Sequence, residues 1–106
     1  MDPRIRTAVD FIEENCHLPL SVGDLAKQVG LSCSRFEHLF RENAGMSFRE
    51  RLCEAHLQTS KVLLADRHLS IKEVAHASGY SSSPTFARNF RKRFGVAPSD
   101  FRSSSG

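Results

Sequence analysis

The sequence contains no tryptophan and one tyrosine, and it has only three cysteines and four prolines in 106 residues. No apolar run approaches the ~18 residues of a membrane span, and no signal-peptide pattern opens the chain. Cys16, Cys33 and Cys53 lie far apart without a CxxC pair, which argues against disulfides and against a zinc site. We therefore expect a cytoplasmic protein that has no membrane contact, no bound metal and no cofactor.

Sequence signatures of enzymes are missing as well. The five histidines show no HExxH or HxH spacing, and there is no GxxxxGK loop and no GxSxG elbow. Cys33, at a helix start near Arg35, could in principle be a reactive thiol, although an inert exposed thiol fits the same sequence. No catalytic residue is predicted, and we do not expect an enzyme.

The composition that is present fits a folded chain. With 40% hydrophobic and 25% charged residues it is globular, and its length allows one domain or two very small halves. The net charge of +3 is unevenly placed: residues 1–50 hold six Lys/Arg and eight Asp/Glu, whereas residues 51–106 hold nine and four. A polyanion would therefore meet mainly the second half of the chain.

Apolar spacing and capping residues predict helices, and no strand signal appears. Ile5, Val9, Ile12 and Cys16 recur at helical spacing, which predicts a helix over roughly residues 4–16. Serines that can cap a helix start precede three further amphipathic segments. These segments begin after Ser21 and end near Gly30, run from Ser32 to about Asn43, and run from about residue 47 to about residue 65.

One pattern occurs twice in the chain. Leu69–Ala75 repeats Leu20–Ala26 at a spacing of 49 residues, and Gly79-Tyr80-Ser81 repeats Gly30-Leu31-Ser32 at the same spacing. Further on the offset becomes 50, so the second copy has one extra residue near Ser82–Pro84. Two helices joined by a short turn with glycine form the helix-turn-helix pattern, and its repetition predicts an all-α chain. The expected divisions are residues 1–46 for a first helix-turn-helix subdomain, 47–66 for a linker helix, 67–102 for a second subdomain and 103–106 for a disordered tail.

The second helix of the second copy has the most informative surface. Phe86, Phe90 and Phe94 recur at every fourth position and predict an apolar stripe that faces a core. The segment from Pro84 to Phe94 holds four cations and no acid, and Pro84 suits the first helical position after three serines that can cap it. Such a helix suits the major groove of DNA, although an ordinary helix with a solvated basic face has the same pattern.

Two copies of the pattern favour DNA binding more strongly than one. The long helix between them, roughly 27 Å, would hold them at a fixed separation, and two recognition helices about one DNA turn apart, ~34 Å, can enter successive major-groove segments. The main alternative is a helical protein-interaction module without DNA binding, because its apolar stripes would look identical. A steep salt dependence of binding to duplex DNA would favour the first interpretation.

The second copy contains a long ordered set of residues, which consists of Ile71, Val74-Ala75, Gly79-Tyr80, Phe86, Arg88, Phe90-Arg91-Lys92, Phe94-Gly95, Pro98 and Phe101-Arg102. With this set as its most specific match, the chain resembles the AraC/XylS family of bacterial transcription regulators from about Ile5 to Arg102. Lys61-Val62-Leu63-Leu64 also looks like the end of the family's linker helix. The resemblance implies about seven helices, two helix-turn-helix subdomains and gene activation at asymmetric promoter sites through contact with RNA polymerase. In most members a ligand-binding or dimerising domain precedes this one, so the chain is expected to be an excised C-terminal domain or a small regulator made of this domain alone.

The resemblance also implies which residues contact DNA. The expected base-reading residues are Ser34, Arg35, Glu37 and His38 in the first copy and Ser82, Ser83, Thr85 and Arg88 in the second. The expected phosphate contacts are the caps Ser32 and Ser81 together with Arg41, Arg91 and Lys92. Pro84 and Ala87 are expected to make van der Waals contacts, whereas Arg93 lies on another side of the helix and is expected to be solvated.

The two copies differ in the chemistry of these residues. Arg88 is the strongest base-reading candidate because a guanidinium pairs with two acceptors of guanine. Glu37 is unusual near phosphates: it either accepts a hydrogen bond from cytosine N4 or serves to reject other sequences. His38 is either a neutral hydrogen-bonding group or an idle surface residue. Phosphate contacts supply affinity and base contacts supply specificity, so the acid-rich first half predicts that the second copy anchors the protein and the first discriminates.

Overall fold

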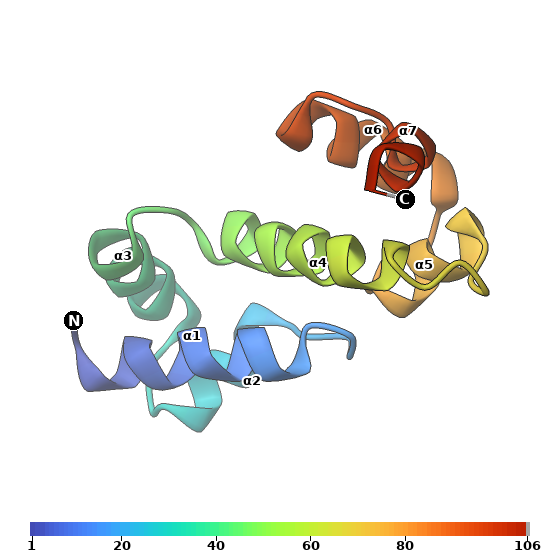
Figure 1. The fold of residues 1–106 in the computed structure, drawn as a ribbon. Coiled ribbons are helices and arrows are strands. Elements are labelled where there is room, and N and C mark those ends of the chain that lie inside the picture. The colour runs from blue at the N-terminus through green and yellow to red at the C-terminus, as the bar shows by residue number, and fades with distance from the viewer. Residues whose placement is uncertain (106) are drawn as a thin grey trace. The chain divides into compact units, whose positions relative to one another are not determined.

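The computed structural model describes residues 1–105, without the side chain of Ser105, and Gly106 lies outside the described residues. Residues 1–105 form seven helices and no strand, so the predicted all-α class is confirmed (Figure 1). The helices are α1 (Pro3–Asn15), α2 (Val22–Gln28), α3 (Cys33–Ala44), α4 (Phe48–Leu64), α5 (Ile71–Ala77), α6 (Ser83–Phe94) and α7 (Pro98–Ser105). None of these helices combines the length and the apolar character that crossing a bilayer requires.

The chain divides into two compact units, and the division falls inside α4. The first unit is Met1–Ala55 and the second unit is His56–Gly106. In the first unit α3 packs against α1 and α2, and in the second unit α6 packs against α5 and α7 (Figure 1). The sequence suggests a separate linker over residues 47–66. In the structure, Leu52 packs on the core of the first unit, and Leu64 is buried at the other end of α4.

The core of the first unit is built on three phenylalanine rings. Phe36 and Phe40 come from α3 and are fully buried, and Phe48 comes from the start of α4. The ring centroids of Phe36 and Phe40 lie 5.7 Å apart, and each lies 6.1 Å from the centroid of Phe48. Ile5 and Ile12 of α1 complete the cluster. Each of these side chains contributes roughly 1.5–3 kcal/mol by its burial, which fixes the face that α3 turns inward.

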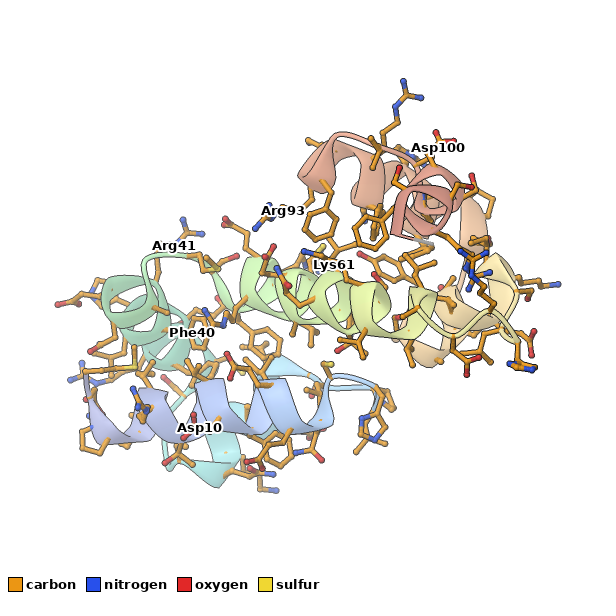
Figure 2. All side chains as sticks on the ribbon, viewed as in Figure 1. Asp10, Phe40, Arg41, Lys61, Arg93 and Asp100 are labelled. Atoms are coloured by element: carbon orange, nitrogen blue, oxygen red, sulfur yellow. The ribbon has the colours of Figure 1, made fainter. Side chains whose placement is uncertain are left out.

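The core of the second unit follows the same plan with more aromatic rings. Phe86 and Phe90 of α6 are fully buried, and their centroids lie 5.7 Å apart. Phe94 lies 4.7 Å and Phe101 of α7 lies 5.5 Å from Phe90. The predicted phenylalanine stripe is therefore confirmed, and Phe101 packs against it. The Nζ of Lys61 lies 4.8 Å from the centroid of Phe94, and the side chain points toward the rings in Figure 2, so a cation–π contact covers this core.

The duplication extends beyond the two helix-turn-helix corners, which are α2 with α3 and α5 with α6. Buried side chains recur at i, i+3 and i+7 in the helix that precedes each corner. In α1 they are Ile5, Ala8 and Ile12, and in the second half of α4 they are Leu57, Ser60 and Leu64. The sequence comparison did not reveal this match, because the residue types differ and the offset is 52 instead of 49. Ser60 is buried without a penalty because its hydroxyl donates to the carbonyl oxygen of Leu57 at 2.6 Å.

Each corner has a glycine where the first helix ends and a serine where the second begins. Gly30 and Gly79 have φ values of 75° and 107°, which glycine adopts without the strain that a Cβ would cause. Ser32 and Ser82 are the N-caps of α3 and α6, and each Oγ lies close to the backbone N–H three residues later, at 3.2 Å and 3.5 Å respectively.

The start of α6 differs from the prediction by one residue. The sequence predicts Ser81 as a cap and Pro84 at the first helical position, and both predictions are wrong: Ser82 is the cap and Pro84 takes the second position. The extra residue of this corner lies in the turn, which moves the helix start. Proline tolerates the second position because the N–H groups of the first turn have no partner within the helix.

The start of α5 is capped by a reciprocal pair of hydrogen bonds that was not predicted from the sequence. The Ser70 hydroxyl accepts from the backbone N–H of Glu73 at 3.0 Å, and the Glu73 carboxylate accepts from the backbone N–H of Ser70 at 2.9 Å. The hydrogen bond from the Ser70 backbone N–H is the largest cause that lowers the pKa of Glu73 below its ordinary value, and the Ser70 side chain lowers it further.

The C-terminal segment is more ordered than the sequence suggests. A disordered tail is predicted for residues 103–106, but α7 continues to Ser105, and Gly106 lies outside the described residues. The hydroxyl groups of Ser103 and Ser104 donate to carbonyl oxygens four residues earlier. The Arg102 side chain donates to the carbonyl oxygens of Leu64 at 3.0 Å and Asp66 at 3.2 Å, which satisfies groups left open where α4 ends.

Candidate nucleic-acid interface

The outward face of α3 holds the residues that the sequence predicts for the first copy. Ser34, Arg35, Glu37 and His38 are all exposed, and so is Arg41. In Figure 2 Arg41 projects away from α3, whereas Phe40 of the same helix points into the core. The buried phenylalanines thus orient the polar stripe toward solvent.

Most of this stripe lines a groove in the first unit. We call it the first groove. It is lined by Leu20, Ser21, Val22, Ser34, Glu37, His38, Arg41, Ser47, Phe48, Arg49 and Leu52. Of the predicted residues, Ser34, Glu37, His38 and Arg41 are therefore brought together, whereas Arg35 is not in the lining.

Three polar residues of the first groove were not predicted from the sequence. Ser21 caps α2, Ser47 accepts from the backbone N–H of Glu50 at the start of α4, and Arg49 follows in the first turn of α4. Their only sequence signal is the capping pattern, which predicts where the helices start but not that both starts border the exposed face of α3.

The outward face of α6 holds the second predicted set. Thr85, Arg88, Arg91 and Lys92 are exposed, whereas Ser82 and Ser83 are half-buried at the helix start. A second groove is lined by Ala87, Arg88, Arg91, Lys92 and Ala97. The structure thus brings together the three predicted cations and leaves Ser82, Ser83 and Thr85 outside this lining.

The two grooves are built from equivalent positions. At the offset of 50 residues that relates α3 to α6, four residues of the first groove match four of the second. The pairs are Glu37 with Ala87, His38 with Arg88, Arg41 with Arg91, and Ser47 with Ala97. The same surface therefore occurs twice in the chain, once with a mixed lining and once with a basic lining.

The charged groups of the two faces differ in their partners. His38 Nε2 lies 3.2 Å from the carboxylate of Glu42 one turn later, and both side chains are exposed. Arg88, Arg91 and Lys92 have no ion-pair partner within residues 1–105. An exposed pair such as His38–Glu42 contributes little to stability, whereas three unpaired cations on one helix face produce a positive potential that attracts a polyanion.

Arg93 is separate from this basic face. It is exposed, as the sequence suggests, but its guanidinium carbon lies 4.9 Å from the centroid of the Phe94 ring. Arg93 therefore packs part of its side chain against Phe94, at the edge of the core of the second unit.

Within residues 1–105 no group of three or more His, Cys, Asp or Glu side chains is arranged to hold a metal ion. Cys33 is exposed at the first position of α3.

Comparisons with known proteins agree with this geometry. The family model described as a helix-turn-helix domain matches residues 25–104. The lactose operon transcription activator of Staphylococcus xylosus is 33% identical over 98 residues, which are 92% of this chain and 35% of that protein. The chain spans about one third of the length of the curated relatives that it matches.

Two solved structures share the fold over nearly the full chain. An AraC-type transcriptional regulator from Chromobacterium violaceum has a TM-score of 0.87 and 33% identity, and the match covers 95% of this chain and 90% of that one. The DNA-binding domain of AdpA, solved in complex with a target DNA, has a TM-score of 0.88 and 25% identity, with 95% and 91% covered.

Proposed function

Because the chain belongs to the AraC-type helix-turn-helix family of DNA-binding transcription regulators, we propose that each unit contacts duplex DNA through its own groove. The exposed faces of α3 and α6 enter two segments of the major groove, and the cations beside them meet phosphates. The observation that carries this proposal is the equivalence of the two groove linings, four positions of which match at one offset. A surface retained in both copies of a duplicated unit is expected to have the same kind of ligand.

The contacts divide by chemistry. Arg88 pairs with guanine, because its guanidinium can donate to two acceptors at once. Arg41, Arg91 and Lys92 meet phosphates, and Ser32 and Ser82 offer hydroxyl groups beside helix starts. Ser81, Ser83, Ser34, Arg35, His38 and Thr85 complete the proposed interface.

The second unit anchors the protein and the first unit discriminates between sequences. The second groove presents three cations and no acid, and two of them, Arg91 and Lys92, bind phosphates whatever the sequence. The first groove contains Glu37 beside Arg41 and Arg49, so the groove attracts phosphate more weakly. Its affinity for DNA therefore depends more on how its residues fit the base edges.

Regulation involves partners outside these residues. We propose activation of transcription through contact with RNA polymerase, in the bacterial cytoplasm, with no catalytic activity of the chain itself. The named activity of the Staphylococcus xylosus relative supports activation. A ligand-binding or dimerising domain is proposed for the whole protein, because the relatives are about three times as long as the matched region.

The test is the salt dependence of binding to duplex DNA. With Arg41, Arg91 and Lys92 on phosphates, the slope of log K against log salt should be about −2.7 or steeper, since each contact contributes about −0.9. Titration of a random duplex between low and physiological salt measures it. Binding that is absent or insensitive to salt would reject the proposal and leave the protein-interaction module.

A further inference from the structure

We propose that Glu37 selects cytosine in the DNA segment that the first unit contacts, an inference that rests on the DNA-binding function proposed above. Glu37 is exposed on α3 and lines the first groove together with Ser34 and Arg41, its neighbours at i−3 and i+4. It therefore lies between these two residues on the exposed face of α3 that we propose to meet the base edges.

The carboxylate of Glu37 is available for a ligand. No ion pair of Glu37 occurs within residues 1–105, although Arg41 follows it by one helical turn. The acid of α3 that is paired is Glu42, which holds His38 at 3.2 Å. Arg41 and Arg49 line the same groove and offset the repulsion between Glu37 and nearby phosphates.

Hydrogen-bond chemistry decides which base a carboxylate accepts. An ionised carboxylate has acceptors only. In the major groove guanine and thymine present acceptors, so both are repelled, and the donors are cytosine N4 and adenine N6. Adenine places its N7 acceptor beside N6, where it opposes the second carboxylate oxygen. Cytosine has no acceptor at that edge, so it is the base that Glu37 selects.

The second unit has no counterpart of this selection. The position equivalent to Glu37 is Ala87, which lines the second groove and cannot hydrogen-bond through its side chain. The difference agrees with a basic, tolerant second unit and a first unit that selects by exclusion.

The experiment selects bound sites from random duplex DNA with four forms of the full chain: the wild type, Glu37→Gln, Glu37→Ala and Glu42→Gln. The wild type should enrich cytosine at one position by about 5- to 140-fold over the other bases, the range of one good base contact. Glu37→Gln should shift that position to adenine, because an amide can donate to N7 and accept from N6. Glu37→Ala should lose the preference there and leave the other positions unchanged.

Glu42→Gln removes the same charge from the same helix outside the groove lining, but it also releases His38, so it is the control for the base opposite Glu37 alone. It should keep the cytosine. Because Glu37 is exposed, the helical content and melting temperature of its variants should equal those of the wild type, which separates misfolding from altered selection. The assignment of Glu37 is overturned if the wild type enriches specific bases and Glu37→Gln or Glu37→Ala enriches the same base at every position. A wild-type selection without any enriched position would instead reject sequence-specific DNA binding itself.

Discussion

The two units share a backbone plan and differ in the charge of their outward faces. Residues 1–55 carry seven Lys/Arg and nine Asp/Glu, whereas residues 56–106 carry eight and three. On the helices that line the grooves, Glu37 and Glu42 of α3 stand where α6 has Ala87 and Lys92. In this fold, different residues of the same helix therefore determine the packing and the ligand. The phenylalanine stripe decides which face points outward, and the residues between the phenylalanines decide what that face binds.

The largest expected effect tests the equality of the two cores. Phe40 and Phe90 are both fully buried, so Phe40→Ala and Phe90→Ala should each lower the free energy of unfolding by about 3–5 kcal/mol. Denaturant titration measures the loss. The control is Val62→Ala, whose side chain is 74% exposed and which should stay within about 0.5 kcal/mol of the wild type. A loss below about 1 kcal/mol for either phenylalanine would contradict a shared plan.

The next effect separates the two faces. Replacing both Arg91 and Lys92 with alanine should reduce the steepness of the salt dependence on random duplex DNA by about 1.8, whereas Arg41→Ala should reduce it by about 0.9. Affinity at low salt should fall accordingly, more for the double variant. Arg67→Ala removes an exposed cation outside both groove linings and should leave the slope unchanged. The anchoring role of the second unit is wrong if Arg41→Ala has the greater effect.

A smaller effect compares the caps of the first helix in each corner. Ser70 takes part in a reciprocal box with Glu73, whereas Ser21 accepts from the backbone N–H of Asp24 at 3.1 Å. Both alanine substitutions should destabilise by about 0.5–2 kcal/mol, with Ser70→Ala the more costly because it disrupts the reciprocal arrangement. Hydrogen exchange of the amides in α5 and α2 reports the local loss. The predicted order is wrong if Ser21→Ala increases the exchange rate in α2 by a larger factor than Ser70→Ala increases it in α5.

The smallest effect is a pH dependence of the second corner. The pKa of Glu73 is lowered in the folded protein, chiefly by the hydrogen bond from the Ser70 backbone. Its contribution to stability is therefore present above the ordinary carboxyl pKa of 4.5 and is lost as pH falls through the lower folded value. The melting temperature of Glu73→Gln should lie below that of the wild type near neutral pH, and the gap should narrow toward about pH 3. A constant gap would show that ionisation of Glu73 does not matter.

The sequence predicted the elements whose signal is local. Phenylalanines at every fourth residue predicted the buried side of α6, and capping serines predicted the start of α3 correctly. Where the corner gained a residue, three adjacent serines offered equivalent caps, so neither Ser81 as the cap nor Pro84 at the first helical position was predicted correctly. Propensity alone could not choose between Ser81 and Ser82.

The parts that the sequence did not reveal depend on contacts between distant segments. Ser21, Ser47 and Arg49 join the first groove only because the starts of α2 and α4 border α3. The capping of α4 by Arg102 spans 38 residues and has no local signature. Residues 103–105 continue α7, the helix that also contains Arg102. The low helix propensity of a serine-rich segment does not predict this continuation.

The division of labour between the two units is tested most directly by the affinities of Arg88→Ala and Glu37→Ala for a selected site and for random duplex DNA. Arg88→Ala should weaken binding to both, and more to the selected site, where a base contact of about 1–3 kcal/mol is also lost. Glu37→Ala should bind random DNA at least as tightly as the wild type, because an acid is removed, while its preference for the selected site falls. If the two variants lose the same affinity on both DNAs, the units do not differ in role.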